Sequence, residues 1–384
     1  MAQCLHRGNE GFGPSRPGPA TPPHRRRRRG AAVLSRAGTD IAQRLLSSLT
    51  EEAMNPLKSP SSRARGLRRI GAALVLGLSA IAASAQFPDK PVTMVLSFPP
   101  AGATDILARA VGQEMSKTLK QSLVIDNKPG AGGNIGLAAA GRAAPDGYTV
   151  YMAAVTNAAI AAAAYPPQQV HLMKDFVPVA GVAIVPHMLV VPATLPVRNV
   201  SQLVALVRQE PGKHNFASQG VGTLSHLESE MLKAAANLDI VHVPYKGSSL
   251  ALPDLIAGNA SMMFDSIPAS MPHVKAGKLR VLAVASSQRM PMLPDVPTVE
   301  ESGLKGFRAD NVFGVMAPKG TPPAALEALT RAVRAAVEAP ELRQRLQEQG
   351  VELRFTPPAE FAKVVDEEFK TWARAVQQAK VKLE

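Results

Sequence analysis

Two segments of the chain run from an apolar, strand-like stretch through small residues into the start of a helix. The first is residues 98–105, Phe-Pro-Pro-Ala-Gly-Ala-Thr-Asp, and the second is residues 218–228, Ser-Gln-Gly-Val-Gly-Thr-Leu-Ser-His-Leu-Glu. Small residues let a ligand approach the backbone, and the free N–H groups of a first helical turn attract anions with the help of the helix dipole. Because one loop lies in each half of the chain, together they predict a cleft with an anion-attracting helix end on either wall.

Each loop also has a purely structural interpretation. In the first loop, Thr104 or Asp105 could cap the helix. In the second, residues 225–228 (Ser-His-Leu-Glu) match a capping box, in which the serine and the glutamate close the helix end. A cap does not require all of the donors that lie here, which are the hydroxyl groups of Thr223 and Ser225 and the imidazole of His226. This excess of donors favours ligand binding.

The histidines and the single cysteine form no recognisable catalytic or metal-binding pattern. No two of the six histidines after residue 85 are four positions apart, no H-E-x-x-H or G-x-S-x-G motif is present, and Cys4 is the only cysteine. We therefore predict no catalytic residue, no metal site and no cofactor. His226 is interpreted as a hydrogen-bonding wall or helix-end residue rather than a general base, because no carboxylate in the sequence is placed to orient it. Asp265, at the end of an apolar run, either points into the cleft or forms an interdomain salt bridge or a turn cap.

Residues 128–136, Lys-Pro-Gly-Ala-Gly-Gly-Asn-Ile-Gly, invite comparison with a dinucleotide-binding loop. A G-x-G-x-x-G motif would require glycine at position 135, where Ile135 stands, and no acidic residue follows at a strand end ~20 positions on. A tight turn leading into a helix explains the stretch better. An exported nucleotide-dependent oxidoreductase therefore remains a remote alternative.

The elements that must position these loops follow from the hydrophobic pattern. Short runs rich in Val, Ile, Leu and Met alternate with helix-like segments, which predicts an α/β protein with buried, mostly parallel strands. Residues 104–119 repeat apolar side chains at helical spacing, and residues 322–380 trace successive amphipathic helices. The expected strands are residues 92–98, 122–126, 149–155, 187–191, 215–218, 239–244, 261–265, 280–285 and 312–317.

The first 85 residues differ in charge from the rest of the chain. They hold 14 Lys and Arg against 4 Asp and Glu, whereas the remaining residues hold 29 and 26. The basic character therefore belongs to the leader, and the nearly balanced body argues against nucleic-acid binding.

Within the leader, residues 54–85 match a secretory signal peptide. A basic start precedes an apolar run over residues 70–83 and an A-x-A site, which predicts cleavage after Ala85 and a periplasmic product. Residues 1–53 are interpreted as a non-native extension ahead of a true start at Met54, because a signal peptide works at an N-terminus. The alternative is a disordered basic arm that binds nucleic acid or membrane.

Seven short motifs follow one another along the body of the chain without large gaps. They are Phe98-Pro99-x-x-Gly102-x-Thr104-Asp105-x-x-Ala108-Arg109, Asn127-x-Pro129-Gly130-Ala131-Gly132-Gly133-Asn134-Ile135-Gly136, Pro145-Asp146-Gly147-Tyr148-Thr149, Asp175-Phe176-x-Pro178-Val179, His226-Leu227-x-x-Glu230, Val243-Pro244-Tyr245-Lys246-Gly247 and Pro294-Asp295-Val296-Pro297-Thr298. From about Phe87 to the C-terminus, this series resembles the Bug family, the extracytoplasmic solute receptors of tripartite tricarboxylate transporters.

The resemblance implies a type II periplasmic-binding-protein fold, in which two α/β domains joined by crossing strands close over a ligand cleft. Residues 86–188 with 309–384 would form domain 1, and residues 189–308 domain 2. The implied function is a monomeric receptor, not an enzyme, that captures a small organic carboxylate and delivers it to membrane subunits of a tripartite transporter. A receptor of the same fold that hands its closed form to a signalling partner is the alternative.

The resemblance also implies that main-chain amides, hydroxyls and ordered waters hold the ligand, rather than an arginine. Two departures from the family pattern lie at the cleft: Pro100 and Ala101 replace an alanine and a glycine, and Ala153-Ala154 replaces a pair that is often Gly-Ser or Gly-Thr. Pro100 removes a donor and Ala101 disfavours positive φ, so the identity of the ligand does not carry over. The candidate ligand-binding residues are Ala101, Gly102, Ala103, Thr104, Asp105, Thr156, Asn157, Ser218, Gly222, Thr223, Ser225, His226 and Asp265.

Overall fold

The computed structural model describes residues 87–379. The expected extension over residues 1–53, the signal peptide over residues 54–85 and the cleavage site after Ala85 lie outside the described residues. Inside the described range, none of the helices is both long enough and apolar enough to cross a membrane.

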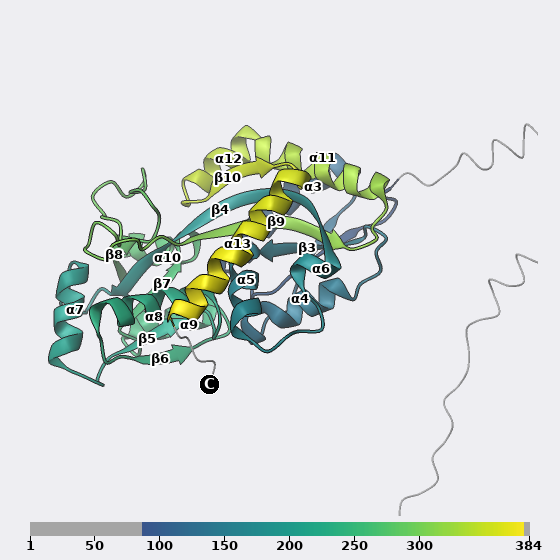
Figure 1. Ribbon diagram of the computed structural model, residues 1–384. Coiled ribbons are helices and arrows are strands. Elements are labelled where there is room, and N and C mark those ends of the chain that lie inside the picture. Colours follow the sequence, from purple (N-terminus) through teal and green to yellow (C-terminus); the bar gives the residue numbers. More distant parts are fainter. Residues whose placement is uncertain (1–86, 380–384) are drawn as a thin grey trace, which may run out of the picture. The chain divides into compact units, whose positions relative to one another are not determined.

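The described residues form a curled sheet with helices packed on it (Figure 1). Its strands follow the spatial order β2-β1-β3-β9-β4-β7-β5-β6, and both β10 and β8 also pair with β4. The strands are β1 (Val92–Leu96), β2 (Leu123–Asn127), β3 (Thr149–Ala154), β4 (Phe176–Pro192), β5 (Asn215–Ser218), β6 (Val241–Pro244), β7 (Met262–Ser266), β8 (Leu279–Val284), β9 (Asp310–Pro318) and β10 (Glu352–Thr356).

The long strand β4 joins two halves of this sheet. It pairs with β9 from Phe176 to Pro186 and with β7 from His187 onward. We call β1, β2, β3, β9 and β10 with their helices the first lobe, and β5, β6, β7 and β8 with their helices the second lobe. The α/β fold expected from the sequence is confirmed.

Each of the nine expected strands is present, but the sheet differs from the expectation in three respects. The strand expected over residues 187–191 begins at Phe176, and β10 was not expected. The expectation of mostly parallel strands also fails, since every pairing of β4 and the β3–β9 pairing are antiparallel. Among the named strands of the described residues, only the β1–β2, β1–β3, β5–β6 and β5–β7 pairs are parallel. Between these two groups, β9 runs opposite to β3, β4 runs opposite to β9, and β7 runs opposite to β4.

The helices cover both faces of the sheet. The helix expected over residues 104–119 is confirmed as α3, which ends where Lys120 adopts a left-handed conformation. The helical segments are α3 (Ala103–Leu119), η1 (Ala131–Gly133), α4 (Asn134–Gly141), α5 (Val155–Ala164), α6 (Leu172–Asp175), α7 (Val200–Gln209), α8 (Leu224–Ala236), α9 (Ser248–Ala257), α10 (Ile267–Lys275), α11 (Pro323–Glu338), α12 (Pro340–Gln347) and α13 (Pro358–Ala379).

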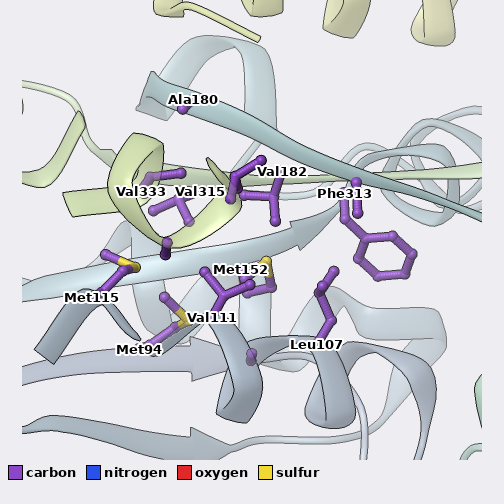
Figure 2. Close-up of a cluster of buried hydrophobic side chains, with 14 of the residues drawn as sticks. Met94, Leu107, Val111, Met115, Met152, Ala180, Val182, Phe313, Val315 and Val333 are labelled. Atoms are coloured by element: carbon purple, nitrogen blue, oxygen red, sulfur yellow. The ribbon is translucent and has the colours of Figure 1, made fainter. Parts of the chain in front are cut away.

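The first lobe is held together by an apolar core between α3, α11 and the sheet. Figure 2 shows Leu107, Val111 and Met115 of α3 beside Met94 and Met152 of β1 and β3. The three α3 side chains recur at helical spacing, and they and the two methionines are fully buried. Burying a side chain of this size contributes roughly 1.5–3 kcal/mol, so this core fixes the start of α3 relative to the strand ends.

The last helix, α13, packs against both lobes (Figure 1). Phe361 and Val365, in its first half, belong to an apolar cluster with β3 and α4 of the first lobe. Trp372 and Val376, in its second half, belong to a cluster that includes α8 of the second lobe. Like β4, α13 therefore contacts both lobes.

Candidate functional site

A narrow cavity lies between the lobes, beside the place where β4 changes partner. Its volume is about 10 Å³, which is room for one water molecule. A larger open depression of about 680 Å³ along α3 and β2 contains none of the candidate residues. The cavity is lined by Phe98, Pro99, Gly102, Ala103, Thr104, Asn157, Asn311 and Phe313 of the first lobe, Gln219, Gly247, Ser248 and Ser266 of the second, and His187 of β4.

Three helices begin at this cavity. The residues that precede their first turns are Gly102 for α3, Gly247 for α9 and Ser266 for α10, and all three line the cavity. None of these residues forms a side-chain capping hydrogen bond. Their first-turn N–H groups and helix dipoles therefore give the cavity the positive potential that attracts an anion.

The first loop contributes its central residues to the cavity. Gly102, Ala103 and Thr104 line it, as the sequence predicted. Ala101 is exposed and has a φ of 65°, a left-handed conformation that is uncommon for alanine. Its N–H donates to Oδ2 of Asp105 at 3.1 Å, so these two residues shape the loop without lining the cavity.

Asp105 is tied to its surroundings by further hydrogen bonds. Arg109 donates from Nε to its Oδ2 at 2.9 Å, and Asn127 donates from Nδ2 to its Oδ1 at 3.1 Å. Burial acts to raise the pKa of Asp105, but these donors and the Ala101 N–H hold that pKa below its ordinary value. The ionised carboxylate therefore fixes the loop ahead of α3.

The second loop uses most of its polar side chains internally. The Thr223 hydroxyl donates to the Gly220 carbonyl at 2.7 Å, and the Ser225 hydroxyl donates to the Phe264 carbonyl. The Ser218 hydroxyl lies 2.7 Å from Nε2 of His242. These three side chains, and Gly222, are not among the residues that line the cavity.

His226 lies behind the second loop in a stack of rings. Its ring centroid is 4.0 Å from that of His242, which in turn lies 4.8 Å from that of Phe216. Nδ1 of His226 accepts the Gly222 N–H at 3.3 Å. Burial lowers the pKa of His226 to about 4 and that of His242 to about 3, so both are neutral near pH 7.

Asn157 and Thr156 have different positions at the start of α5. Asn157 lines the cavity and accepts the Leu224 N–H at 2.8 Å, a hydrogen bond between the lobes. The Thr156 hydroxyl instead donates to the Asp310 carbonyl at 3.2 Å and contacts the Glu368 carboxylate. Thr156 therefore connects α5 with β9 and α13 and does not line the cavity.

Asp265 supports the cavity wall from behind. It accepts hydrogen bonds from Gln219 Nε2 at 2.7 Å and from Ser248 Oγ at 2.6 Å, and both of these donors line the cavity. Ser270 donates to its other carboxylate oxygen. The carboxylate thus positions two residues of the second lobe that sequence reasoning did not select.

Three further cavity residues, His187, Ser266 and Asn311, were not among the candidates from the sequence. His187 Nε2, Ser266 Oγ and Asn311 Oδ1 are buried polar atoms without a hydrogen-bond partner. All three residues line the cavity, and His187 and Ser266 are opposite each other in the β4–β7 register. The sequence offered only a polar residue inside an apolar run for His187, and a polar residue next to an aspartate at the edge of such a run for Ser266 and Asn311. Neither pattern identifies a binding residue by itself.

The glycine stretch over residues 128–136 packs against β1. A Cβ on Gly136 would lie 2.7 Å from the Cα of Ser97, so glycine lets the start of α4 approach the strand. Close packing thus explains this glycine without a nucleotide cofactor.

The family model of the tripartite tricarboxylate transporter family receptor matches residues 107–381. The chain is 38% identical over 328 residues to a UPF0065 protein encoded between tcbD and tcbE in Pseudomonas sp. (strain P51), covering 84% of this chain and 97% of that protein. It is 33% identical over 308 residues to protein BugT of Bordetella pertussis (strain Tohama I), covering 80% of this chain and 94% of BugT.

Solved structures agree with these sequence matches. An R. palustris protein solved with adipate is 33% identical, with a TM-score of 0.74 over 77% of this chain and 99% of that protein. MatC from Rhodopseudomonas palustris, solved with malate, is 33% identical, with a TM-score of 0.72 over 76% of this chain and all of that protein. The fold and the sequence motifs therefore lead to one conclusion: the chain belongs to the tripartite tricarboxylate transporter receptor family, the periplasmic solute-binding proteins that include the Bug proteins.

Proposed function

We propose that this protein captures a small organic carboxylate in the cavity between its lobes and delivers it to the membrane subunits of a tripartite tricarboxylate-type transporter. The observation that carries the proposal is the convergence of the starts of α3, α9 and α10 on one cavity. Adipate and malate, which occupy two structurally similar proteins, belong to the class of anion that such helix ends bind.

Capture by closure of the lobes is supported by the size of the cavity. At about 10 Å³, it has no room for a molecule with several carboxylate and carbon atoms unless the walls move apart. We infer that domain 1 comprises residues 86–188 with 309–384 and domain 2 residues 189–308. The change of β4 from β9 to β7 between Pro186 and His187 supports this division, and binding energy would shift the equilibrium toward the closed form.

The candidate ligand contacts divide into two groups. We infer that Gly102, Ala103, Thr104 and Asn157 contact the ligand, because they line the cavity. The other candidates act on the shape of the wall: Ala101, Asp105, Thr156, Ser218, Gly222, Thr223, Ser225, His226 and Asp265.

We further infer that the protein acts by binding rather than catalysis, as a monomer, after export and cleavage behind Ala85. Its family of transport receptors supports the binding role and the periplasmic location. The closed form is the state that membrane subunits would recognise, because it alone reports an occupied cleft.

A thermal-shift experiment tests the proposal. The full chain is unfolded and refolded to remove carried-over ligand, and then mixed with adipate, malate, succinate, benzoate, NAD or NADP. A ligand that binds only the folded protein must raise the unfolding temperature in a concentration-dependent way. We expect at least one carboxylate to do so and neither nucleotide. A response to the nucleotides alone would overturn the proposal in favour of the exported oxidoreductase.

A further inference from the structure

A buried histidine and a buried glutamate meet at the cavity. His187 and Glu228 are both fully buried, and Nδ1 of the imidazole lies 2.7 Å from Oε2 of the carboxylate. Nε2 of His187 and Oε1 of Glu228 have no hydrogen-bond partner. Because the imidazole lines the cavity and its Nδ1 is occupied, Nε2 is the atom that remains available to a molecule bound there.

Two other unpaired atoms belong to residues that line the same cavity, and they support this interpretation. Ser266 of β7, opposite His187, and Asn311 of β9 both line the cavity, and Ser266 Oγ and Asn311 Oδ1 have no hydrogen-bond partner. Leaving one buried polar group unpaired costs about 1–3 kcal/mol. Three such groups around one cavity indicate a wall built to bind a polar ligand group.

The carboxylates around His187 favour a proton on its imidazole. Glu228 of α8, Asp265 of β7 and Asp310 of β9 all act on it. Burial alone would lower the pKa of His187, but these three carboxylates raise that pKa above its ordinary value. Burial also raises the pKa of Glu228.

Both shifts favour the form of the pair that carries two protons. In this form one proton lies between Nδ1 and Oε2, and the other is on Nε2. Whether the shared proton sits on the imidazole or on the carboxylate, Nε2–H is a donor and the pair has no net charge.

We propose that His187 selects the ligand by donating a hydrogen bond from Nε2–H to a carboxylate oxygen of the bound anion, while Glu228 holds the imidazole in place. This inference rests on the proposed capture of a carboxylate. When the pair loses one proton, Nε2 becomes an acceptor and the pair becomes negatively charged, so it repels a carboxylate. Capture is thus coupled to the protonated pair, and affinity falls as the pH rises.

Isothermal calorimetry on the refolded full chain tests the coupling, with adipate, malate, succinate and benzoate as probes. Their carboxylates are ionised throughout the range from about pH 6.5 to about pH 9, so the ligand charge stays constant. We expect the affinity to fall by up to about tenfold per pH unit once the pair begins to lose its proton. Titrations in two buffers with different ionisation enthalpies should then show proton uptake on binding.

Three variants locate the effect. His187→Gln keeps an amide donor but cannot titrate, so we expect about tenfold weaker binding at the low end of the range and no proton uptake. Glu228→Gln keeps the imidazole but removes the carboxylate, so the pH transition should move to lower pH. His214→Gln is the matched control, because this other buried histidine contacts Ser261 at 3.0 Å and does not line the cavity. It should bind as wild type does.

The outcomes separate this inference from the proposed function. Carboxylate binding by the wild type with no pH dependence and no proton uptake would overturn the role of His187 and leave the receptor function standing. Failure of the wild type to bind any of the four probes would overturn both. Since the proton-uptake measurement uses only wild-type protein, it decides the matter even if His187→Gln does not fold.

Discussion

The two glycine-containing loops share one sequence pattern but have different positions at the cavity. In the first loop, Gly102, Ala103 and Thr104 line the cavity at an uncapped helix start. In the second, Thr223 and Ser225 direct their hydroxyls to carbonyl oxygens of their own lobe. The first loop therefore presents its backbone to the cavity, whereas the second, apart from Gln219, maintains the wall behind it.

The second loop also forms hydrogen bonds to the first lobe, whereas the first loop approaches the second lobe through the Pro99 ring beside Gly247. The Leu224 N–H donates to Asn157 Oδ1 at 2.8 Å, and the Tyr165 hydroxyl donates to the Val221 carbonyl at 3.0 Å. Both hydrogen bonds join the second loop to the first lobe. A small-residue loop before a helix can thus serve a ligand or a neighbouring domain, and the pattern alone does not distinguish the two.

The largest expected effect is acid destabilisation through the ring stack behind the second loop. His226 has a pKa of about 4 in the folded protein, against about 6.5 when unfolded, so between these values the unfolded state binds more protons. Stability is therefore complete above about pH 6.5 and falls as the pH falls. For His226 alone the loss approaches about 3 kcal/mol at pH 4, and urea unfolding across this range measures it.

A paired variant isolates the stack from other acid effects. Ser218→Ala with His242→Phe removes one titrating ring and its hydroxyl partner together, while a phenyl ring can still stack on Phe216. We expect a shallower decrease in stability with falling pH. A pH profile identical to that of wild type would show that the stack does not control the second loop.

A crossed pair of substitutions tests the contrast between the loops directly. Ser225→Ala removes the donor to the buried Phe264 carbonyl and should cost about 1–3 kcal/mol in the free energy of unfolding, with little change in carboxylate affinity. Thr104→Ala, at the cavity, should weaken carboxylate binding about tenfold and leave stability nearly unchanged. Calorimetry and urea unfolding measure both quantities. If Ser225→Ala weakened binding at unchanged stability, its hydroxyl would contact the ligand as the sequence predicted.

A third test concerns the approach of the lobes at the first loop. Gly247 has a φ of 124°, and a Cβ there would lie 2.6 Å from the Pro99 ring of the opposite lobe. Gly247→Ala should therefore oppose closure and weaken carboxylate binding by about tenfold. Gly258→Ala is the control, because its φ of 81° imposes similar backbone strain but no atom lies within 4 Å of the added carbon. Equal affinities in the two variants would exclude a steric effect on closure.

The sequence predicts the elements of this fold well where burial alone decides them. The apolar runs at β1, β3 and β9 and the helical spacing in α3 mark buried faces, and all four elements are present. The first part of β4 was missed because Pro178 and Pro186 are unusual within a strand. The chain accommodates Pro178 beside register shifts in the β4–β9 pairing.

The candidate site was less predictable, because the role of a polar side chain depends on a distant partner. Ser225 has the same sequence context whether it bonds to Phe264, 39 residues away, or to a ligand. His187 acquires its partner Glu228 from 41 residues away, because α8 packs against β7, the neighbour of β4 in the sheet. Local patterns show that a group can donate a hydrogen bond, but only the fold determines what receives it.

The smallest expected effect concerns the contact between the second loop and the first lobe. Tyr165→Phe removes one partly buried hydrogen bond to the Val221 carbonyl, so carboxylate affinity should fall about threefold. Because the lost contact joins the lobes that the proposed closure brings together, the change should appear as faster ligand dissociation with an unchanged association rate, measured by stopped-flow fluorescence. Tyr245→Phe is the matched control, since its hydroxyl donates to Asp254 within the second lobe. Similar dissociation rates in the two variants would show that the second loop only supports the cavity wall and does not hold the lobes together.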